Sequence, residues 1–584
     1  MKRLPVIVIL GITLVIAGLL SCEKEVEKIV QAPPAITVTE ITLSADEITQ
    51  GQVVDLSAVV ETEDTVDTGD LVYNWYADKG SFQVSEGDTA VWKAPADSGM
   101  VLVSVHVTDG QDIAVGNRSV GVDMYTPSAD VYYVGDETCQ QCHSDIHEGW
   151  AQTGHAEAWA SLQTSDHAAP YCEPCHTVNQ NDTEGNSGYD EVATMKFQDV
   201  QCESCHGPGS AHAGSPSPEN IDSQTEALAE ATCAVCHEGG HHPYHEQWEE
   251  SAHNFDPTTS AHGAGARSYC QPCHSGTGFV EAFDESYTDL YANSENKMGI
   301  TCAVCHDTHS DENPGLLRTT EAFTLVTNGY DSDGETPETI DLGGAGQLCI
   351  QCHHARHAPE GPNDTQISQG DEHMGPHGST QADAVYGESG YEAINKDFTF
   401  ASSGHGLIED ACVSCHVYMT EYDPVTEFAN VGHTFEPRVE ACTQCHGEIS
   451  DFSDIMAKRD YDNDGSVEGL QNEVSGLISS LVTSLVEYDN AHGGQYLGGD
   501  TEAEPSVIAD SLAATFGDTS ETAVELRKGG YNLIYALDEG SHGVHNPAYV
   551  VQLLQQSIEY INPGKLPENV ILREPQATTF VADK

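Results

Sequence analysis

Basic residues are scarce in this chain: 21 Lys and Arg stand against 94 Asp and Glu in 584 residues, which gives a formal net charge of −73. Nucleic-acid binding is excluded, because phosphate contacts depend on Lys and Arg. The mutual repulsion of so many acidic side chains is tolerable where salt shortens the Debye length to about 8 Å. The composition therefore suggests a saline habitat or bound divalent cations, and an acidic surface that is either a docking face or simply solvated.

Cysteine for disulfides is also lacking, since eighteen of the 19 cysteines fall into nine CxxCH motifs, numbered 1 to 9 in chain order. CxxCH is the attachment signature of c-type haem: the thiols add to the porphyrin vinyl groups and the histidine binds the iron. A zinc knuckle or a redox dithiol needs no histidine directly after the second cysteine. The motifs therefore predict nine c-type haems. The predicted thioether residues are Cys139, Cys142, Cys172, Cys175, Cys202, Cys205, Cys233, Cys236, Cys270, Cys273, Cys302, Cys305, Cys349, Cys352, Cys412, Cys415, Cys442 and Cys445. The predicted proximal iron ligands are His143, His176, His206, His237, His274, His306, His353, His416 and His446.

The nineteenth cysteine, Cys22, ends a predicted bacterial lipoprotein signal. A charged start is followed by an apolar run from Leu4 to Leu20, and Leu19-Leu20-Ser21-Cys22 matches the lipobox. We expect removal of residues 1–21, lipidation of Cys22 and a tether over 22–35, so that the exported protein is anchored to a membrane. The expected location is the outer membrane, the periplasm or the extracellular face. An uncleaved signal anchor is the alternative, because the run is nearly long enough to span a bilayer.

Residues 36–125 alternate apolar and polar positions in short runs separated by Gly, Asp and Pro, which predicts an all-β sandwich. Trp75 is expected in its core, and His106 is expected to be structural rather than a ligand. The segment resembles the Ig-like or PKD-like modules of cell-surface proteins. Such a module would act as a spacer or an adhesive domain.

The region 132–450 contains a repeat. Each of the first two copies has a Trp followed five positions later by a histidine, and from His155 to Cys172 and from His253 to Cys270 is 17 residues. The last two motifs of successive copies are spaced 30, 32 and 30 residues apart. This predicts three trihaem modules, over 139–232, 233–330 and 349–450. Because the intervening sequence is rich in Gly, Ser, Asp and Glu, we expect the porphyrins to form the core, with short helices at the motifs and no continuous sheet.

Methionine is too scarce to complete nine irons, because only five lie beyond the β region. Histidine is therefore the predicted second axial ligand, which favours low-spin haems of low potential. Surface histidines are the alternative at each position. The predicted distal ligands are His155, His212, His253, His309, His357 (or His354), His377, His405, His433 and His545. Duplicated modules of this kind can exchange such ligands across their boundaries.

After the last motif, residues 455–584 show helical periodicity, with helices predicted over 467–488, 503–516, 520–538 and 547–562. Asn546 suits the N-cap and Pro547 the first helical position of the last one. A loop beginning at Asp460 spaces its oxygens like an EF-hand, with Gly465 at the turn, although Gln471 replaces the usual Glu. A helix-leading acidic turn is the alternative. The candidate calcium ligands are Asp460, Asp462, Asp464, Ser466 and Glu468.

Residues 132–562 resemble the multihaem cytochromes c related to hydroxylamine oxidoreductase, cytochrome c nitrite reductase and the tetrahaem cytochrome of nitrifiers. The matching pieces are the two W-x4-H elements, CESCHGPGSAH (202–212), CAVCHDTH (302–309), GHTFEP (432–437) and GVHNPAYVVQLLQQSI (543–558). The resemblance implies closely packed haem pairs, some parallel and some perpendicular. It also implies distal ligation by His155, His212, His253, His309, His433 and His545. The CxxCK of the nitrite reductases is absent, and no tyrosine can be nominated for the cross-link of the hydroxylamine oxidoreductases.

The expected protein is multidomain: an all-β sandwich, a haem-packed, mainly α and irregular cytochrome region, and a helical C-terminal segment. Its predicted function is electron transfer at the cell envelope or surface, as in anaerobic or extracellular respiration, by a carrier rather than an enzyme. The partners would be other cytochromes or quinol-linked donors and an extracellular acceptor. The alternatives are a reductase or oxidase of a small nitrogen or sulfur compound with one five-coordinate haem, and a filament-forming cytochrome.

Overall fold

The structure is a computed structural model. It describes residues 36–573 except 46–47, 49, 63–70, 97–98, 111, 123–130, 166–167, 180–187, 190–194, 222–228, 240–241, 258, 260–263, 266, 284–297, 326–338, 342, 360–364, 395–397, 401 and 424–427. The predicted signal, Cys22 and the tether lie outside the described residues. The chain divides into two compact units, one of residues 1–135 and 158–201 and the other of residues 136–157 and 202–584.

The N-terminal part is the predicted all-β region, built from two antiparallel sheets. Their orders are β1-β2-β5-β4 and β3-β6-β7. The strands are β1 (Ile36–Leu43), β2 (Val53–Thr62), β3 (Val72–Ala77), β4 (Ser81–Val84), β5 (Thr89–Lys93), β6 (Gly99–Thr108) and β7 (Ile113–Val122). Alternate residues of β6, such as Val103 and Val105, are fully buried because successive side chains of a strand point to opposite faces. Trp75 is buried between them and the other sheet's apolar residues, and its indole donates to the Gly87 carbonyl at 2.9 Å.

Short helices form at every CxxCH motif, as the sequence predicts. They are α2 (Asp136–Gln140), α5 (Glu173–His176), α6 (Cys202–His206), α9 (Glu230–Ala234), α11 (Gln271–His274), α13 (Cys302–Cys305), α14 (Gln347–Ile350), α16 (Cys412–His416) and α17 (Val439–His446). Between them lie α3 (Ser144–Trp150), α4 (Ala158–Thr164), α7 (Ser210–Gly214), α10 (Tyr244–Glu250), α12 (Gly276–Phe283) and α15 (Gln381–Tyr386). The described strands of this region form only two-stranded pairs, β8 (Phe323–Thr324) with β9 (Thr339–Ile340) and β10 (Thr420–Asp423) with β11 (Phe428–Asn430).

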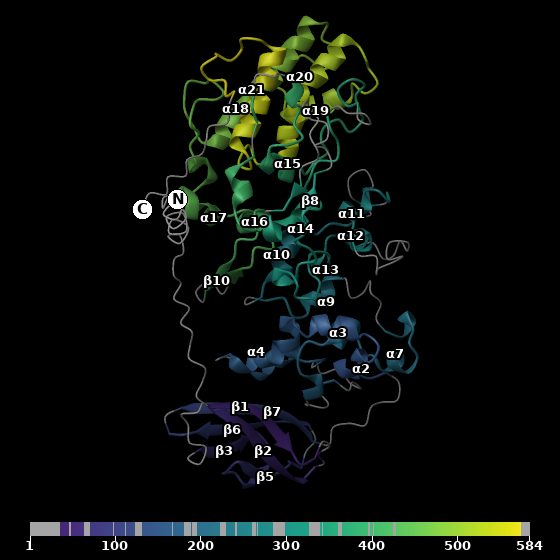
Figure 1. Ribbon diagram of the computed structural model, residues 1–584, viewed down its shortest axis with the longest axis vertical. Coiled ribbons are helices and arrows are strands. Elements are labelled where there is room, and N and C mark those ends of the chain that lie inside the picture. The colour runs from purple at the N-terminus through teal and green to yellow at the C-terminus, as the bar shows by residue number, and fades with distance from the viewer. Residues whose placement is uncertain are drawn as a thin grey trace, which may run out of the picture. The chain divides into compact units, whose positions relative to one another are not determined.

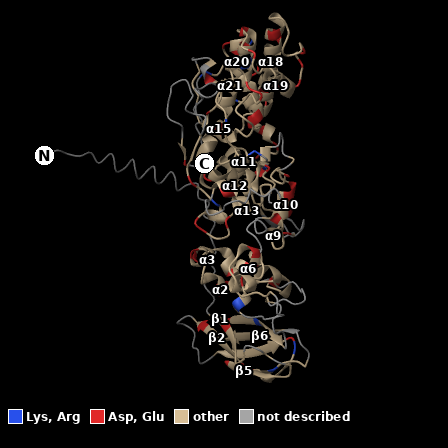
Figure 2. Ribbon diagram, turned by 90° about the vertical axis from the view of Figure 1, so that its right-hand side faces the viewer, with Lys and Arg blue, Asp and Glu red and all other residues tan. Residues whose placement is uncertain are grey.

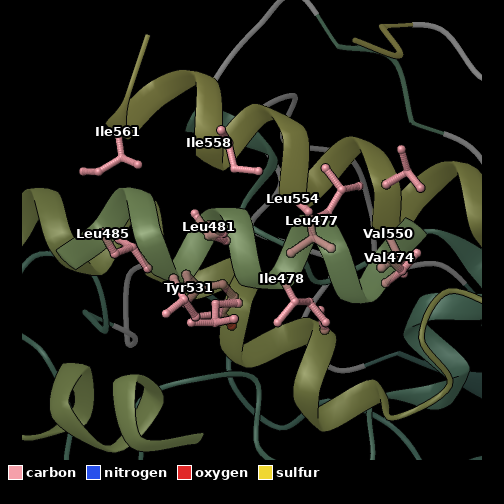
Figure 3. Close-up of a cluster of buried hydrophobic side chains, with 14 of the residues drawn as sticks. Val474, Leu477, Ile478, Leu481, Leu485, Tyr531, Val550, Leu554, Ile558 and Ile561 are labelled. Carbon is pink, nitrogen blue, oxygen red and sulfur yellow. The ribbon is translucent and has the colours of Figure 1, made fainter. Parts of the chain in front are cut away.

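The C-terminal helices α18 (Leu470–Ala491), α19 (Pro505–Ala513), α20 (Glu521–Glu539) and α21 (Pro547–Ile561) form one bundle (Figure 1). In Figure 3, Leu477, Leu481 and Leu485 of α18 face Val550 and Ile558 of α21, all of them buried. Their spacing of four or eight residues places them on one stripe of each helix. Full burial of such a side chain stabilises the fold by about 1.5–3 kcal/mol, so this bundle has an apolar core of its own.

The described motif region buries apolar side chains mostly in small clusters, one of which consists of Phe279, Val280, Val304 and Leu348. Acidic residues occur along the whole described ribbon and basic residues are sparse (Figure 2). None of the helices in the described part of the chain combines the length and the hydropathy needed to cross a bilayer.

Candidate haem sites and their axial histidines

Each motif forms one turn of helix. In motif 1 the amide of His143 donates to the Cys139 carbonyl at 3.0 Å, and in motif 4 the amide of His237 donates to Cys233 at 3.0 Å. Residues at i, i+3 and i+4 share one helix face, so the two sulfurs and the imidazole of a motif project to the same side. The eighteen motif cysteines are all free thiols in the structure. This is the arrangement that thioether attachment to a single porphyrin requires.

Eight of the nine motif histidines face a second histidine ring across a gap. Their ring centroids are 6.1–6.3 Å apart. The pairs are His143 with His212, His206 with His309, His237 with His155, His274 with His377, His306 with His433, His353 with His253, His416 with His545 and His446 with His405.

This separation is too long for ring stacking but suits a metal ion between two imidazoles. Two metal–nitrogen bonds of about 2 Å, added to the half-widths of two imidazole rings, give a centroid distance of roughly 6 Å. The same distance recurs at eight separate places although the interplanar angles run from 16° to 84°. The residues present therefore fit a bis-histidine haem at each of these eight motifs.

The hydrogen bonds of the second histidines favour the same role. Because a carbonyl or carboxylate oxygen only accepts, each ring must carry its proton on Nδ1, which leaves the lone pair of Nε2 for a metal. Six of the eight second histidines donate in this way. The acceptors are Ser217 O for His212 (2.9 Å), Asp307 Oδ1 for His309 (3.0 Å), Gly378 O for His377 (3.2 Å), Val544 O for His405 (2.8 Å), Val431 O for His433 (2.8 Å) and Glu539 Oε1 for His545 (2.7 Å).

Burial favours the neutral form of several of these imidazoles. It lowers the pKa of His253 to about 4, and it does the same to His237, where the neighbouring His155 adds to the effect. Burial also lowers the pKa of the His306 and His433 rings, which face each other. A neutral imidazole is the form that ligates iron, so protons compete little with the metal at pH 7.

The pairs cross the module boundaries in both directions. His155 of the first module faces motif 4 of the second, while His309 of the second faces motif 3 of the first. The next boundary repeats the exchange, because His253 faces motif 7 and His433 faces motif 6. The predicted modules would therefore interlock, and the equivalent positions His212 and His309 do not face equivalent motifs.

Two buried polar residues that sequence reasoning missed position these histidines. Gln247 on α10 is 3% exposed; its amide donates to Ala429 O at 3.0 Å and accepts from the amides of Val431 and His433 at 3.1 and 3.2 Å. It thereby holds the segment that carries His433. Glu539, 1% exposed at the end of α20, accepts from Nδ1 of His545. No sequence signal marks either residue, because each acts on a segment that only folding brings close.

His176 of motif 2 differs from the others. Its Nδ1 donates to Ala158 O at 2.6 Å, but within its own compact unit, residues 1–135 and 158–201, the described residues place no second imidazole about 6 Å from its ring. The predicted ligand His357 takes part through its backbone, where its carbonyl accepts from Tyr531 at 3.3 Å. The alternative, His354, is buried with its ring against Phe323. The ligand of motif 2 stays a prediction.

Thiols of different motifs lie against one another. The thiols of Cys139 and Cys202, of Cys233 and Cys302, of Cys273 and Cys352, and of Cys349 and Cys412 lie close enough to interact. These contacts bring together motifs 1 and 3, 4 and 6, 5 and 7, and 7 and 8. Motifs that lie next to each other in space are thus not always consecutive in the sequence.

Comparison with known proteins identifies c-type cytochromes. The family model described as "Cytochrome c554 and c-prime" matches residues 138–207. C-type polyheme cytochrome OmcB of Geobacter sulfurreducens is 28% identical over 356 residues, which are 53% of this chain and 46% of OmcB. Cytochrome c-554 of Nitrosomonas europaea is 32% identical over 100 residues, 14% of this chain and 41% of its own. The chain thus spans less than half the length of these curated relatives.

Two solved structures are also similar. The undecahaem cytochrome from the S-layer of Carboxydothermus ferrireducens is 19% identical with a TM-score of 0.43, over 75% of this chain and 70% of its own. Outer cell wall cytochrome OcwA is 15% identical with a TM-score of 0.45, over 74% of this chain and 99% of its own.

Proposed function

We propose, from the premise that this chain is a multihaem c-type cytochrome, that it carries nine haems and transfers electrons through them at the cell envelope. The observation that carries the proposal is the set of eight imidazole pairs at 6.1–6.3 Å. The haems would supply reversible one-electron exchange at iron. The motif cysteines and histidines hold them, and two histidines on an iron leave no position for a substrate.

The thiol contacts support an order for the electron path. Direct contacts join motifs 1 to 3, 4 to 6 and 7 to 8, and the thiols of Cys205 and Cys233, Cys305 and Cys349, and Cys415 and Cys442 lie close enough to influence one another electrostatically. Together they give the continuous order 1, 3, 4, 6, 7, 8, 9, with motif 5 joined to motif 7. Side-by-side haems are what short electron hops require.

Export and membrane anchoring belong to the same proposal. Lipidation at Cys22 would hold the protein at the outer membrane, in the periplasm or on the extracellular face. The sandwich would then separate the anchor from the haems. Its partners would be envelope cytochromes or quinol-linked donors on one side and an extracellular acceptor on the other.

Haem stoichiometry and iron coordination test the proposal. A pyridine haemochrome assay on the purified protein should give nine haems per chain, and low-temperature EPR of the oxidised protein should show at least eight low-spin ferric haems. A count well below nine would contradict the cofactor assignment. Several high-spin haems would contradict the axial pairs.

A second candidate function concerns His176, for which the described residues of its own compact unit supply no second imidazole. A five-coordinate haem at motif 2 would leave one iron position for a small nitrogen or sulfur compound, as in a reductase or oxidase. A single high-spin haem in the EPR spectrum, converted to low spin by added cyanide or nitric oxide, would support it, and a wholly low-spin spectrum would exclude it. Polymers seen by microscopy would instead favour a filament in which a histidine of another copy completes this haem.

A further inference from the structure

The loop 458–468 leaves and returns to the bundle at one point. The amide of Ala457 donates to the Glu468 carbonyl at 2.8 Å, and the amide of Leu470 donates to the Ile455 carbonyl at 2.9 Å. Helix α18 begins directly afterwards, at Leu470. The loop is therefore closed at its base and attached to the start of the longest helix described.

Glu473 in the first turn of α18 holds the loop from inside. It is 1% exposed, and its carboxylate accepts from the amides of Tyr461 at 2.6 Å, Asp462 at 3.3 Å and Glu468 at 2.9 Å. Its two oxygens are thus used by the backbone. Sequence reasoning overlooked this residue because it lies two positions beyond the last ligand position of an EF-hand loop.

Three more carboxylates converge beside it. Oxygens of Asp460, Asp462 and Asp464 all lie within 4.8 Å of one another. One oxygen of each accepts a backbone amide of the loop, from Gly465 at 3.0 Å, Asp464 at 3.1 Å and Ser466 at 2.7 Å respectively. No Lys or Arg of the described chain forms an ion pair with these three residues or with Glu473. Like charges are thus held together without a protein cation.

Two features favour a bound ion in this cluster. The second oxygen of Asp460, Oδ1, is buried and meets no hydrogen-bond donor. A buried carboxylate oxygen without a partner is costly unless an ion or a donor fills the place. Gly476, in the interior of α18, leaves the space that Oδ2 of Asp462 occupies, since a Cβ there would overlap that oxygen. Glycine is unfavourable inside a helix by about 1 kcal/mol, so its presence here has a packing reason.

We propose that Asp460, Asp462 and Asp464 bind one hard divalent cation, for which Ca²⁺ is the best match. Calcium takes oxygen ligands in a flexible geometry, whereas Mg²⁺ demands a near-ideal octahedron and softer metals prefer nitrogen or sulfur. Ser466 would complete the site through its carbonyl and Glu468 through its side chain, directly or through water; both are candidate ligands predicted from the sequence.

The cation would stabilise the start of α18, and with it the segment 541–545. Gln471 Nε2 donates to the Ser541 carbonyl at 3.1 Å, and Ser475 Oγ is hydrogen-bonded to His542 Nδ1 at 2.9 Å. This segment carries His545, one of the paired imidazoles. The site therefore belongs to the scaffold of the haem array, although cation binding does not depend on electron transfer.

The test is calorimetric titration of the full-length, haem-loaded protein with CaCl2 after removal of metals by a chelator. About 150 mM KCl suppresses diffuse binding to the acidic surface. We expect one saturable site, and a fall in melting temperature when chelator is added. Asp462→Asn and Gly476→Ala should each weaken calcium binding by roughly 10–100-fold.

Gly476→Ala keeps every carboxylate and favours the helix, so it remains informative if Asp462→Asn fails to fold. Asp510→Asn is the matched control, since it removes an exposed charge from α19 of the same bundle. It should leave the titration unchanged. An isotherm that is the same in all four proteins, or no saturable site at all, would overturn the proposal.

Discussion

At the residue scale, the histidines differ in what their Nδ1 donates to. His405 and His433 donate to backbone carbonyls, whereas His545 donates to the buried carboxylate of Glu539 at 2.7 Å. A carboxylate acceptor makes the imidazole a stronger donor to iron, which favours Fe³⁺. The haem at motif 8 is therefore expected to have the lowest potential among these three sites.

Glu539→Gln should raise the potential of that haem. The amide oxygen can still accept from Nδ1, so the ring stays in place, but the charge-assisted part of the bond is lost. That part is worth about 1 kcal/mol, or roughly 40 mV for one electron. A redox titration followed by EPR should show one low-spin haem moving upward. The exposed Glu521→Gln, on the same helix, should change nothing, and a downward shift would contradict the argument.

At the element scale, α20 carries an unfavourable negative charge at its C-terminal end. Asp538 stands in its last turn, where the helix dipole disfavours negative charge. Burial raises the pKa of Asp538 to about 6, against about 3.9 in an unfolded chain. Because the folded state holds this proton more tightly, the contribution to stability is fully present below pH 4 and is lost as the pH rises through 6. The cost at pH 7.5 is on the order of 2 kcal/mol.

Asp538→Asn should therefore stabilise the bundle at pH 7.5 and have little effect at pH 4. Thermal unfolding followed by far-UV circular dichroism at the two pH values measures the difference. The exposed Asp510→Asn provides the comparison for a simple loss of charge. Equal stabilisation by Asp538→Asn at both pH values would show that its carboxyl titrates normally.

At the scale of the whole molecule, repulsion and interlocking act against each other. A net charge of −73 opposes compaction, and the haem propionates add to it. The exchange of histidines between modules works in the other direction, because each shared iron would tie two modules together. Loss of one haem would free a ligand in the neighbouring module, so we expect the modules to unfold together rather than singly.

Screening of this charge repulsion by added salt should therefore stabilise the folded protein. Raising NaCl from about 10 to about 150 mM shortens the Debye length from roughly 30 to roughly 8 Å. With chelator present, the melting temperature should rise by at least about 2 °C, equivalent to roughly 1 kcal/mol. Choline chloride at the same ionic strength should give the same rise, because the effect is screening and not sodium binding. A fall in melting temperature would contradict it.

Much of this protein follows from local sequence alone. A CxxCH motif occupies one helical turn, so the position of each predicted haem attachment is readable without the fold. The same holds for the bundle, where the predicted helix 547–562 is observed as Pro547–Ile561 with Asn546 as its cap. The all-β region and its buried Trp75 also follow from alternation. In each case the signal lies within a few residues of the feature it determines.

Which histidine rings face each other was decided by the tertiary structure. His416 and His545 are 129 residues apart in sequence, and the repeat even suggests equivalences that the fold breaks, since His212 pairs within its module and His309 outside it. Glu473 and Glu539 were likewise invisible, because a buried carboxylate is recognised by the groups folded around it. The two cysteines and the histidine that attach a haem lie within five consecutive residues. The second axial ligand would come from a distant segment, which only folding brings close.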